Sequence, residues 1–375
     1  MFSTGKKGCL FPKKIRAKLI YVSSSINDLW VGNIADAGWK GEKNMMMENI
    51  RCPVCSSKNV IRKGRRKNRF GYRQLYFCKD CGKGFVEKDR GMSNKTYNPK
   101  VILNAVSYYN LGSTLEESSR LVNRRFKVNV SKSSVHQWLK ECGNVCTYHK
   151  LRPEMLKNYK KNENILFSKA FEHNGLSYNF RYHKPKLEIL CQGNVFSNLK
   201  EYLMGFEKKG CPARFFEDDD RCSQLRINVR DFGRERCYNN ACQLAGLALK
   251  MCDNNRERHS VVEKFMLVID SSTVACEVPV WFWEKNLDSG ISGHIDLLQI
   301  RNKRIYVMDF KPDAQKENEQ RVASQLFLYA SGLSFRTGIG LGRFRCAWFD
   351  DKNYYEFSPK EVNVGFTGLK NMGEV

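Results

Sequence analysis

Two Cys-x-x-Cys pairs restrict the fold of this chain more than any other feature of its sequence. Cys52 and Cys55 form the first pair, Cys78 and Cys81 form the second, and 22 residues separate the pairs. Four thiolates with this spacing converge tetrahedrally on one Zn²⁺, and such a site keeps no open position for chemistry. A segment this short cannot bury a core, so we expect the metal to supply much of its folding energy. The pairs therefore predict a structural zinc ribbon over residues 48–90.

Positive charge is concentrated in the same part of the chain. The 375 residues include 64 Lys and Arg against 39 Asp and Glu, a net charge of +25. Residues 1–150 hold 30 basic and 10 acidic side chains, whereas residues 151–375 hold 34 and 29. Lys and Arg displace counterions from phosphate backbones, so an excess of this size indicates a polyanionic partner. We expect the front part to bind nucleic acid and the nearly balanced rear part to have a different role.

The segment between the two cysteine pairs is both basic and aromatic. On a hairpin stabilised by zinc, its basic side chains would face the phosphates of DNA, and contacts of this kind give affinity and orientation but no choice of sequence. The plainer alternative is a charged surface that faces only water. The candidates for phosphate contact are Arg65, Arg66, Lys67 and Arg69.

Helical periodicity follows the ribbon, within residues 97–148. The apolar residues from Val101 onward recur at spacings of three and four, Leu115–Phe126 forms a second segment, and Ser131 begins a third that ends at Cys142. Three helices in this order fit a helix-turn-helix whose third helix reads a DNA groove, although an ordinary helical connector is the alternative. The third helix would bury Val135, Trp138 and Leu139 and would offer to DNA Lys132, Ser133, Ser134, His136, Gln137 and Lys140.

Cysteine usage and the lack of long apolar runs bear on the compartment. Fifteen cysteines are an odd number, and four of them lie in the pairs typical of metal binding. No secretory signal is visible, and no apolar run reaches the roughly 18–20 residues of a membrane span. We therefore expect a cytoplasmic, reduced protein with no membrane partner. Buried free thiols, rather than a second metal site, are expected for Cys142, Cys146, Cys191, Cys211, Cys222, Cys237, Cys242 and Cys252.

The remaining segments differ in how clearly they predict structure. Residues 1–47 show no periodicity and are expected to be a disordered extension, or to precede the true start. Residues 150–250 are interpreted as a linker or helical region, with a solvated acidic run at Glu217–Asp220 and a helix at Asn239–Met251. Within residues 251–360, apolar runs indicate an α/β or α+β core. The runs predict strands at Phe265–Ile269, Val274–Phe282, His294–Ile300 and Ile305–Phe310, and a helix from Glu319 to Gly332.

Charged residues interrupt the apolar strands of this core where chemistry could take place. Asp296 breaks one strand, and Asp309 and Lys311 lie two apart at the end of the next, so both point to one face. Carboxylates are hard oxygen ligands suited to Mg²⁺ or Mn²⁺, and the carbonyl of Phe310 could be a further ligand. Lys311 would orient or deprotonate a metal-bound water. Each residue alone also has a plainer explanation as a turn or an exposed strand end.

Two parts of the sequence resemble known families. The ribbon and the helical segments resemble the N-terminal zinc ribbon and helix-turn-helix of insertion-sequence transposases, which implies binding to double-stranded DNA. The rear part resembles the PD-(D/E)xK nuclease superfamily, in particular its RecB-like branch, through GxxD at Gly293–Asp296, (D/E)xK at Asp309–Lys311 and QxxxY at Gln325–Tyr329. The resemblances imply a multidomain α+β protein: a zinc ribbon, a three-helix helix-turn-helix, and an α/β restriction-endonuclease-like core.

The superfamily adds an acid, or in the RecB-like branch a histidine, on a helix before the first core strand. Glu263 is the favoured candidate for this role, followed by Glu277, and His259 is a third option. The resemblance thus implies Glu263, Asp296, Asp309, Lys311 and Gln325 as catalytic residues. Some relatives also carry a C-terminal iron–sulfur cluster, but Cys346 is the one cysteine beyond the motifs, so no cluster is expected.

Together these observations predict a DNA-binding, divalent-metal-dependent deoxyribonuclease. A DDE-type transposase is the first alternative, suggested by Asp270 at the end of the run Phe265–Ile269. A non-catalytic DNA-binding regulator is the second. The sequence leaves the DNA target and the oligomeric state open, and a dimer is compatible with it.

Overall fold

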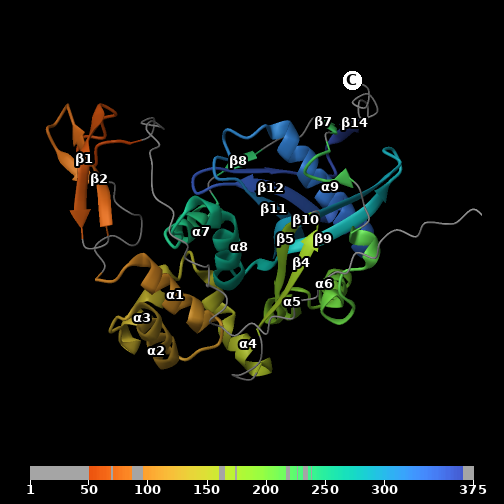
Figure 1. Ribbon diagram of the computed structural model, residues 1–375, viewed down its shortest axis with the longest axis horizontal. Helices are drawn as coiled ribbons and strands as arrows, with labels where there is room; N and C mark the ends of the chain where they lie inside the picture. Colours follow the sequence, from red (N-terminus) through yellow and green to blue (C-terminus); the bar gives the residue numbers. More distant parts are fainter. Residues whose placement is uncertain are drawn as a thin grey trace, which may run out of the picture.

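A three-stranded antiparallel ribbon surrounds the cysteine pairs in the computed structural model of the protein. Its strands are β1 (Val60–Asn68), β2 (Gly71–Cys78) and β3 (Gly84–Val86), and Figure 1 shows them beside the rest of the molecule. The ribbon has a small apolar core of its own, which includes Val60 and Tyr76. The segment thus does bury a core, contrary to the expectation from its length, but a small one in which two of the buried residues are Cys52 and Cys78.

The structure describes residues 50–68, 71–86, 96–159, 165–173, 175–216, 220–225, 227–230, 235–237 and 239–365. The extension expected at residues 1–47 therefore lies outside the described residues. So do Arg69 and most of the acidic run expected at Glu217–Asp220.

Three helices follow the ribbon at the predicted positions. They are α1 (Pro99–Asn110), α2 (Leu115–Phe126) and α3 (Lys132–Cys142). Local signals set their beginnings: Thr114 and Glu117 form a reciprocal capping box at α2, and the Ser131 hydroxyl accepts from the amide of Ser134 at α3. The helical prediction for this segment is confirmed.

A mixed sheet forms the centre of the rear part. Its main strands are β4 (Leu166–His173), β5 (Leu176–His183), β9 (Thr273–Glu284), β10 (Ser289–Arg301), β11 (Arg304–Phe310), β12 (Phe344–Phe349), β13 (Tyr354–Phe357) and β8 (Glu235–Cys237), side by side in that order. These neighbours are antiparallel except β11 and β12, which run parallel. Parallel neighbours need a long crossover. Helix α9 (Glu319–Thr337) supplies it.

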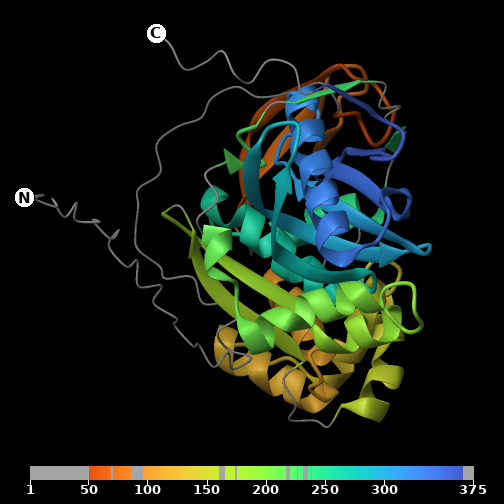
Figure 2. The same ribbon diagram turned by 90° about the vertical axis from the view of Figure 1, so that its right-hand side faces the viewer.

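Helices cover both faces of this sheet (Figure 1, Figure 2). On one face lie α6 (Ser197–Lys209), α9 and the short α5 (Lys184–Leu190). On the other lie α7 (Asn240–Leu249) and α8 (Arg258–Ile269), and the helices α1 to α3 share one hydrophobic cluster with them and with the sheet. The amide of Asn110 in α1 donates to the Val268 carbonyl in α8 at 3.3 Å. The three helices α1 to α3 are thus part of the core rather than attached to it by a linker.

The shorter elements connect these layers. Helix α4 (Arg152–Asn158) leads from the three helices to β4, and β6 (Asp220–Arg221) runs parallel beside the start of β10. Strand β7 (Asn228–Arg230) pairs with β14 (Asn363–Gly365) in a separate small sheet. In the part of the chain that the structure describes, no helix is both long enough and apolar enough to cross a membrane.

One predicted strand is wrong, and one region holds strands that the sequence did not reveal. The apolar run Phe265–Ile269 is the last part of α8, where every residue is at most 1% exposed. A helix buried on all sides has the same continuous apolar run as a buried strand, so periodicity cannot separate them. The region 150–250, interpreted as helical, also supplies the paired strands β4 and β5. The other predicted strands lie within β9, β10 and β11, and the predicted helices are α7 and α9.

Candidate functional site

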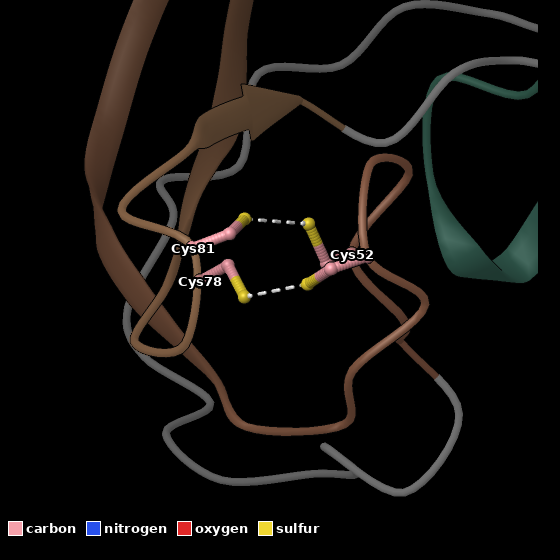
Figure 3. A group of neighbouring side chains, drawn as sticks. Cys52, Cys78 and Cys81 are labelled. Carbon is pink, nitrogen blue, oxygen red and sulfur yellow. Dashed lines mark hydrogen bonds between the residues drawn. The ribbon is translucent and has the colours of Figure 1, made fainter.

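The four ribbon cysteines come together as their spacing predicts. Figure 3 shows Cys52 on one loop facing Cys78 and Cys81 on another. The Sγ–Sγ distance is 3.5 Å between Cys52 and Cys81 and also between Cys55 and Cys78. Tetrahedral zinc–sulfur bonds of about 2.3 Å require thiolates about 3.8 Å apart, so the arrangement fits the ion. Burial opposes ionisation of Cys52, but amide hydrogen bonds from Cys55 and Val54 lower its pKa to about 6. This group can hold a metal ion such as Zn²⁺.

The basic segment between the cysteines lies on the β1–β2 hairpin. Arg65 and Arg66 are exposed on β1, next to a bulge at which Gly64 has a φ of 83°. Lys63 Nζ lies 4.4 Å from the centre of the Phe77 ring. Lys67 is also part of β1. The hairpin therefore presents basic side chains to solvent on one strand.

Helix α3 presents its polar side as the sequence predicts. Val135, Trp138 and Leu139 are buried against the other helices, so their side chains are not available to a partner. Ser134 is half-buried, because its amide and hydroxyl bond to the capping Ser131. The exposed candidates for contact with DNA are Lys132, Ser133, His136, Gln137 and Lys140.

In the rear part, three carboxylates and a histidine meet between α8 and the sheet. His259 and Glu263 lie one turn apart on α8, and His259 Nδ1 is 3.3 Å from a Glu263 oxygen and 3.5 Å from an oxygen of Asp296 on β10. These three residues offer ligand atoms that all lie within 4.8 Å of one another. Asp309 follows on the neighbouring strand β11 and repels Asp296 through its charge. Three of the predicted ligands, Glu263, Asp296 and Asp309, therefore lie close together, with His259 beside them.

Lys311 lies against Asp309 just beyond the end of β11. Its Nζ is 2.8 Å from Asp309 Oδ2, and its backbone amide donates to the Phe349 carbonyl of β12 at 2.9 Å. The hydrogen bond of the Lys311 amide holds the backbone at Lys311 against β12, the strand that runs parallel to β11. Phe310, between them, packs its ring against those of His259 and Phe349. The (D/E)xK residues are thus positioned by the β11–β12 pair.

Burial leaves part of this negative charge uncompensated. Asp309 and Glu263 are at most 1% exposed, and within the described part of the chain Glu263 Oε2 and Asp309 Oδ1 have no hydrogen-bond partner. A buried carboxylate oxygen without a partner costs free energy that a bound cation would offset. The donor set is oxygen-rich, which suits Mg²⁺ or Mn²⁺. The residues present therefore fit a divalent ion.

The pKa shifts show the same surplus of acids. Burial raises the pKa of Asp309 well above its usual value, repulsion by Asp296 adds to it, and Lys311 opposes both. Burial likewise raises the pKa of Glu277 to about 9. Burial opposes protonation of His259, but Asp296 and then Glu263 raise its pKa to about 10. Without a cation, each of these shifts favours the protonated form of its group, and a bound divalent cation would favour the ionised carboxylates instead.

Glu277 reaches the same place from β9. It lies opposite Asp296, between the pairs Ile295↔Val278 and Leu297↔Cys276, and its φ of 51° interrupts the regular strand. A non-glycine residue in this conformation is strained and often marks a functional position. Glu277 and Asp296 line one cavity of about 280 Å³. All three candidates for the upstream position thus lie at the site, Glu263 and His259 on α8 and Glu277 on β9.

Gly293 of the GxxD motif and Tyr329 of the QxxxY motif pack directly against each other. A Cβ atom on Gly293 would lie 2.5 Å from Cε1 of Tyr329, so only glycine allows α9 to pack this closely on β10. Gln325 Nε2 donates to the Tyr329 hydroxyl at 3.1 Å, one turn away on α9. Gln325 therefore orients Tyr329, and Tyr329 lines the cavity beside Asp296.

Asp270, the basis of the transposase alternative, lies elsewhere. It follows α8 rather than a strand, and its Oδ2 accepts from the Thr273 amide, the Thr273 hydroxyl and Gln299 Nε2 at 2.6–3.0 Å. These bonds give Asp270 a structural role in the turn between α8 and β9.

Sequence reasoning missed several residues at the cavity: Tyr178, Arg221, Ser223 and His294. Tyr178 and Arg221 come from the region whose strands were not recognised, so no pattern linked them to the motifs. His294 stands inside the GxxD motif itself, which was the one available signal.

The remaining cysteines of the described part of the chain form no disulfide bond. Cys146, Cys191, Cys222 and Cys242 are buried, whereas Cys142, Cys211 and Cys252 are partly buried.

Comparisons with models of protein families, with curated proteins and with solved structures found no match.

Proposed function

We propose that this protein is a DNA-binding deoxyribonuclease that hydrolyses phosphodiester bonds with Mg²⁺ or Mn²⁺. The observation that carries the proposal is the meeting of Glu263, Asp296 and Asp309, from three different elements, with Lys311 held at 2.8 Å from Asp309. This is the order and context that the resemblance to PD-(D/E)xK nucleases implies. The exposed basic residues of the hairpin and of α3 support DNA as the substrate.

The chemistry follows from the positions of these groups. Asp296, Asp309 and Glu263 would hold the ion, with Glu277 and the Phe310 carbonyl as further oxygen donors. A divalent ion bound there lowers the pKa of a water and neutralises charge on the phosphate. Burial opposes the protonated form of Lys311, but Asp309 and Asp296 raise its pKa, so this side chain would be a cation. It would orient that water by a hydrogen bond and offset the phosphate charge, while the proton that the water loses would pass to solvent. Attack at phosphorus forms one P–O bond and breaks the P–O bond to the leaving sugar oxygen, which takes up a proton.

The test is a plasmid nicking assay with purified full-length protein. Addition of EDTA should abolish cleavage and added Mg²⁺ or Mn²⁺ should restore it. Asp309→Ala and Lys311→Ala should each lower the rate at least about a hundredfold. DNA binding, measured by fluorescence anisotropy, should be retained in both variants.

The exposed ion pair Asp313–Lys316, 3.9 Å apart and close by in sequence, provides matched controls. Asp313→Ala and Lys316→Ala should cleave at the wild-type rate. Cleavage that survives both Asp309→Ala and Lys311→Ala would show that another centre does the chemistry. Metal-independent DNA binding without any cleavage would favour the regulator instead.

A further inference from the structure

The cavity beside the carboxylates also has an arginine in its lining. His259, Glu277 and Asp296 line it, together with Tyr178, Arg221 and Ser223. DNA approaching a cluster of acids meets repulsion unless positive groups lie close to its phosphates. Lys311 lies beside Asp309 and is not among the residues lining this cavity. Arg221 is therefore the guanidinium available on the cavity wall.

The short strand β6 places Arg221 beside the motif that carries Asp296. Arg221 pairs with Ser292 of β10 in parallel register, and the amide of the next residue, Cys222, donates to the Ser292 carbonyl at 2.9 Å. Ser292 directly precedes Gly293, the first residue of the GxxD motif. The position of Arg221 relative to Asp296 is thus set by main-chain hydrogen bonds and not by a flexible loop.

Tyr178 orients the Arg221 side chain. The guanidinium donates to the Tyr178 hydroxyl, and the Tyr178 ring lies flat on the His294 ring, with centroids 3.6 Å apart and an angle of 3° between the planes. His294 is 4% exposed, so the ring pair is anchored in the core. A guanidinium fixed at one end keeps its other N–H groups in a defined fork.

Arg221 has no acidic partner among the residues whose positions are described. No described carboxylate lies within 4.0 Å of it as an ion pair, although acids surround the same cavity. An arginine that only stabilised the fold would be expected to pair with one of them. A half-buried guanidinium that pairs with none of the described acids, is oriented by a tyrosine and lines a cavity is suited to bidentate recognition of an anion.

We propose that Arg221, held by Tyr178, is a phosphate-binding subsite for the DNA strand next to the catalytic carboxylates. It binds a backbone phosphate adjacent to the one that is cleaved. The inference rests on the proposed nuclease function for its substrate, because a DNA strand is what brings a second phosphate to this place. It assigns to Arg221 substrate positioning rather than the chemical step.

Binding without turnover tests the subsite directly. The probe is the dinucleotide pTpT, added to full-length protein in EDTA and followed by isothermal titration calorimetry, with inorganic phosphate and unphosphorylated thymidine as comparison ligands. Arg221→Ala should weaken pTpT binding at least about tenfold, as expected for loss of a charge-assisted hydrogen bond. Arg221→Lys should restore part of the affinity. Tyr178→Phe, which removes the hydroxyl alone, should give an intermediate loss.

Kinetics of cleavage provide the second measurement. With Mg²⁺ and a short oligonucleotide, Arg221→Ala should raise KM about tenfold and change kcat by less than about threefold, because uniform binding energy is what is lost. Arg345→Ala removes another half-buried arginine, on β12, and controls for a general effect on the fold. It should leave both pTpT affinity and KM unchanged.

The outcomes separate the two proposals. Cleavage by the wild type with pTpT affinity and KM unaltered in Arg221→Ala overturns the subsite and leaves the nuclease. Binding of pTpT that depends on Arg221, without cleavage under any metal, supports the subsite and overturns the nuclease. Equal binding of inorganic phosphate and pTpT would show a simple anion site and overturn the assignment to the DNA strand.

Discussion

The front and the rear of this molecule carry their charge in opposite ways. Lys132 and Lys140 on α3 are open to solvent, whereas Glu263 and Asp309 are at most 1% exposed. Exposed charge is available to a partner but is screened by salt, and buried charge is protected from salt but costs free energy until something compensates it. The net charge of +25 therefore indicates how the exposed side chains meet a partner. It gives no information about the few buried acids on which the chemistry would depend.

Loss of the metal from the ribbon should give the largest difference in stability between the two regions, because it should unfold the ribbon and leave the rear part folded. Cys78→Ser removes one of four ligands, and structural zinc of this kind contributes on the order of 10 kcal/mol to folding. We expect loss of bound zinc and rapid hydrogen exchange over residues 50–68 and 71–86, with protection of the central sheet unchanged. Mass spectrometry of hydrogen exchange and a zinc assay measure this.

Cys191→Ser is the control, since Cys191 is buried in the core of the rear part. This variant should keep its zinc. Full zinc occupancy in Cys78→Ser would refute the four-cysteine site, and loss of protection in the sheet would show that the two regions do not fold separately.

Substitution of the α3 lysines should have a smaller effect, confined to the front. Each phosphate contact adds about 0.9 to the slope of log affinity against log salt. Lys132→Ala with Lys140→Ala should therefore reduce that slope by about 2 and leave kcat at saturating DNA unchanged. Anisotropy titrations at several salt concentrations measure the slope. Lys157→Ala, an exposed lysine on α4 paired with Glu154, should not alter it.

The smallest effect should be a change, with pH, in the free energy of unfolding of the rear part when no metal is bound. Burial, with Glu263 and Asp296, raises the pKa of Glu277 from 4.5 to about 9, so the folded protein keeps a proton that the unfolded chain loses. The free energy of unfolding should fall as pH rises through this window, by at most about 1.4 kcal/mol per pH unit from this group. Glu277→Gln should flatten the fall in urea titrations.

Glu284→Gln, on the same strand but outside the cavity, is the matched control and should keep the wild-type slope. An identical slope in Glu277→Gln and in the wild type would show that other groups dominate. Added Mg²⁺ should flatten the wild-type slope, because the cation replaces the protons.

Local patterns predicted much of this structure from the sequence. Cysteine spacing placed the ribbon, and Ser131 placed the beginning of the third helix. Period-two and period-four spacing put Asp309 with Lys311 and Gln325 with Tyr329. All these signals act over a few residues, where backbone geometry decides which side chains share a face.

What escaped prediction depends on contacts between distant segments. The run Phe265–Ile269 is a helix because α7, α1 and the sheet surround it, and the run itself does not record this. Arg221 lines the same cavity as Asp296 because a two-residue strand pairs with β10, some 70 residues later. A strand that short carries no periodicity, so no sequence rule could have found it.

The core shared by α1, α8 and the sheet has a consequence for where DNA would be cut. Helix α3, which would read the groove, packs with α1, and α1 bonds through Asn110 to the helix that carries His259 and Glu263. Helix α3 and the carboxylate cluster are thus held at a fixed distance from each other by one packed core. If α3 binds a DNA sequence and the cluster cleaves DNA, the breaks should fall at a constant number of base pairs from the bound sequence.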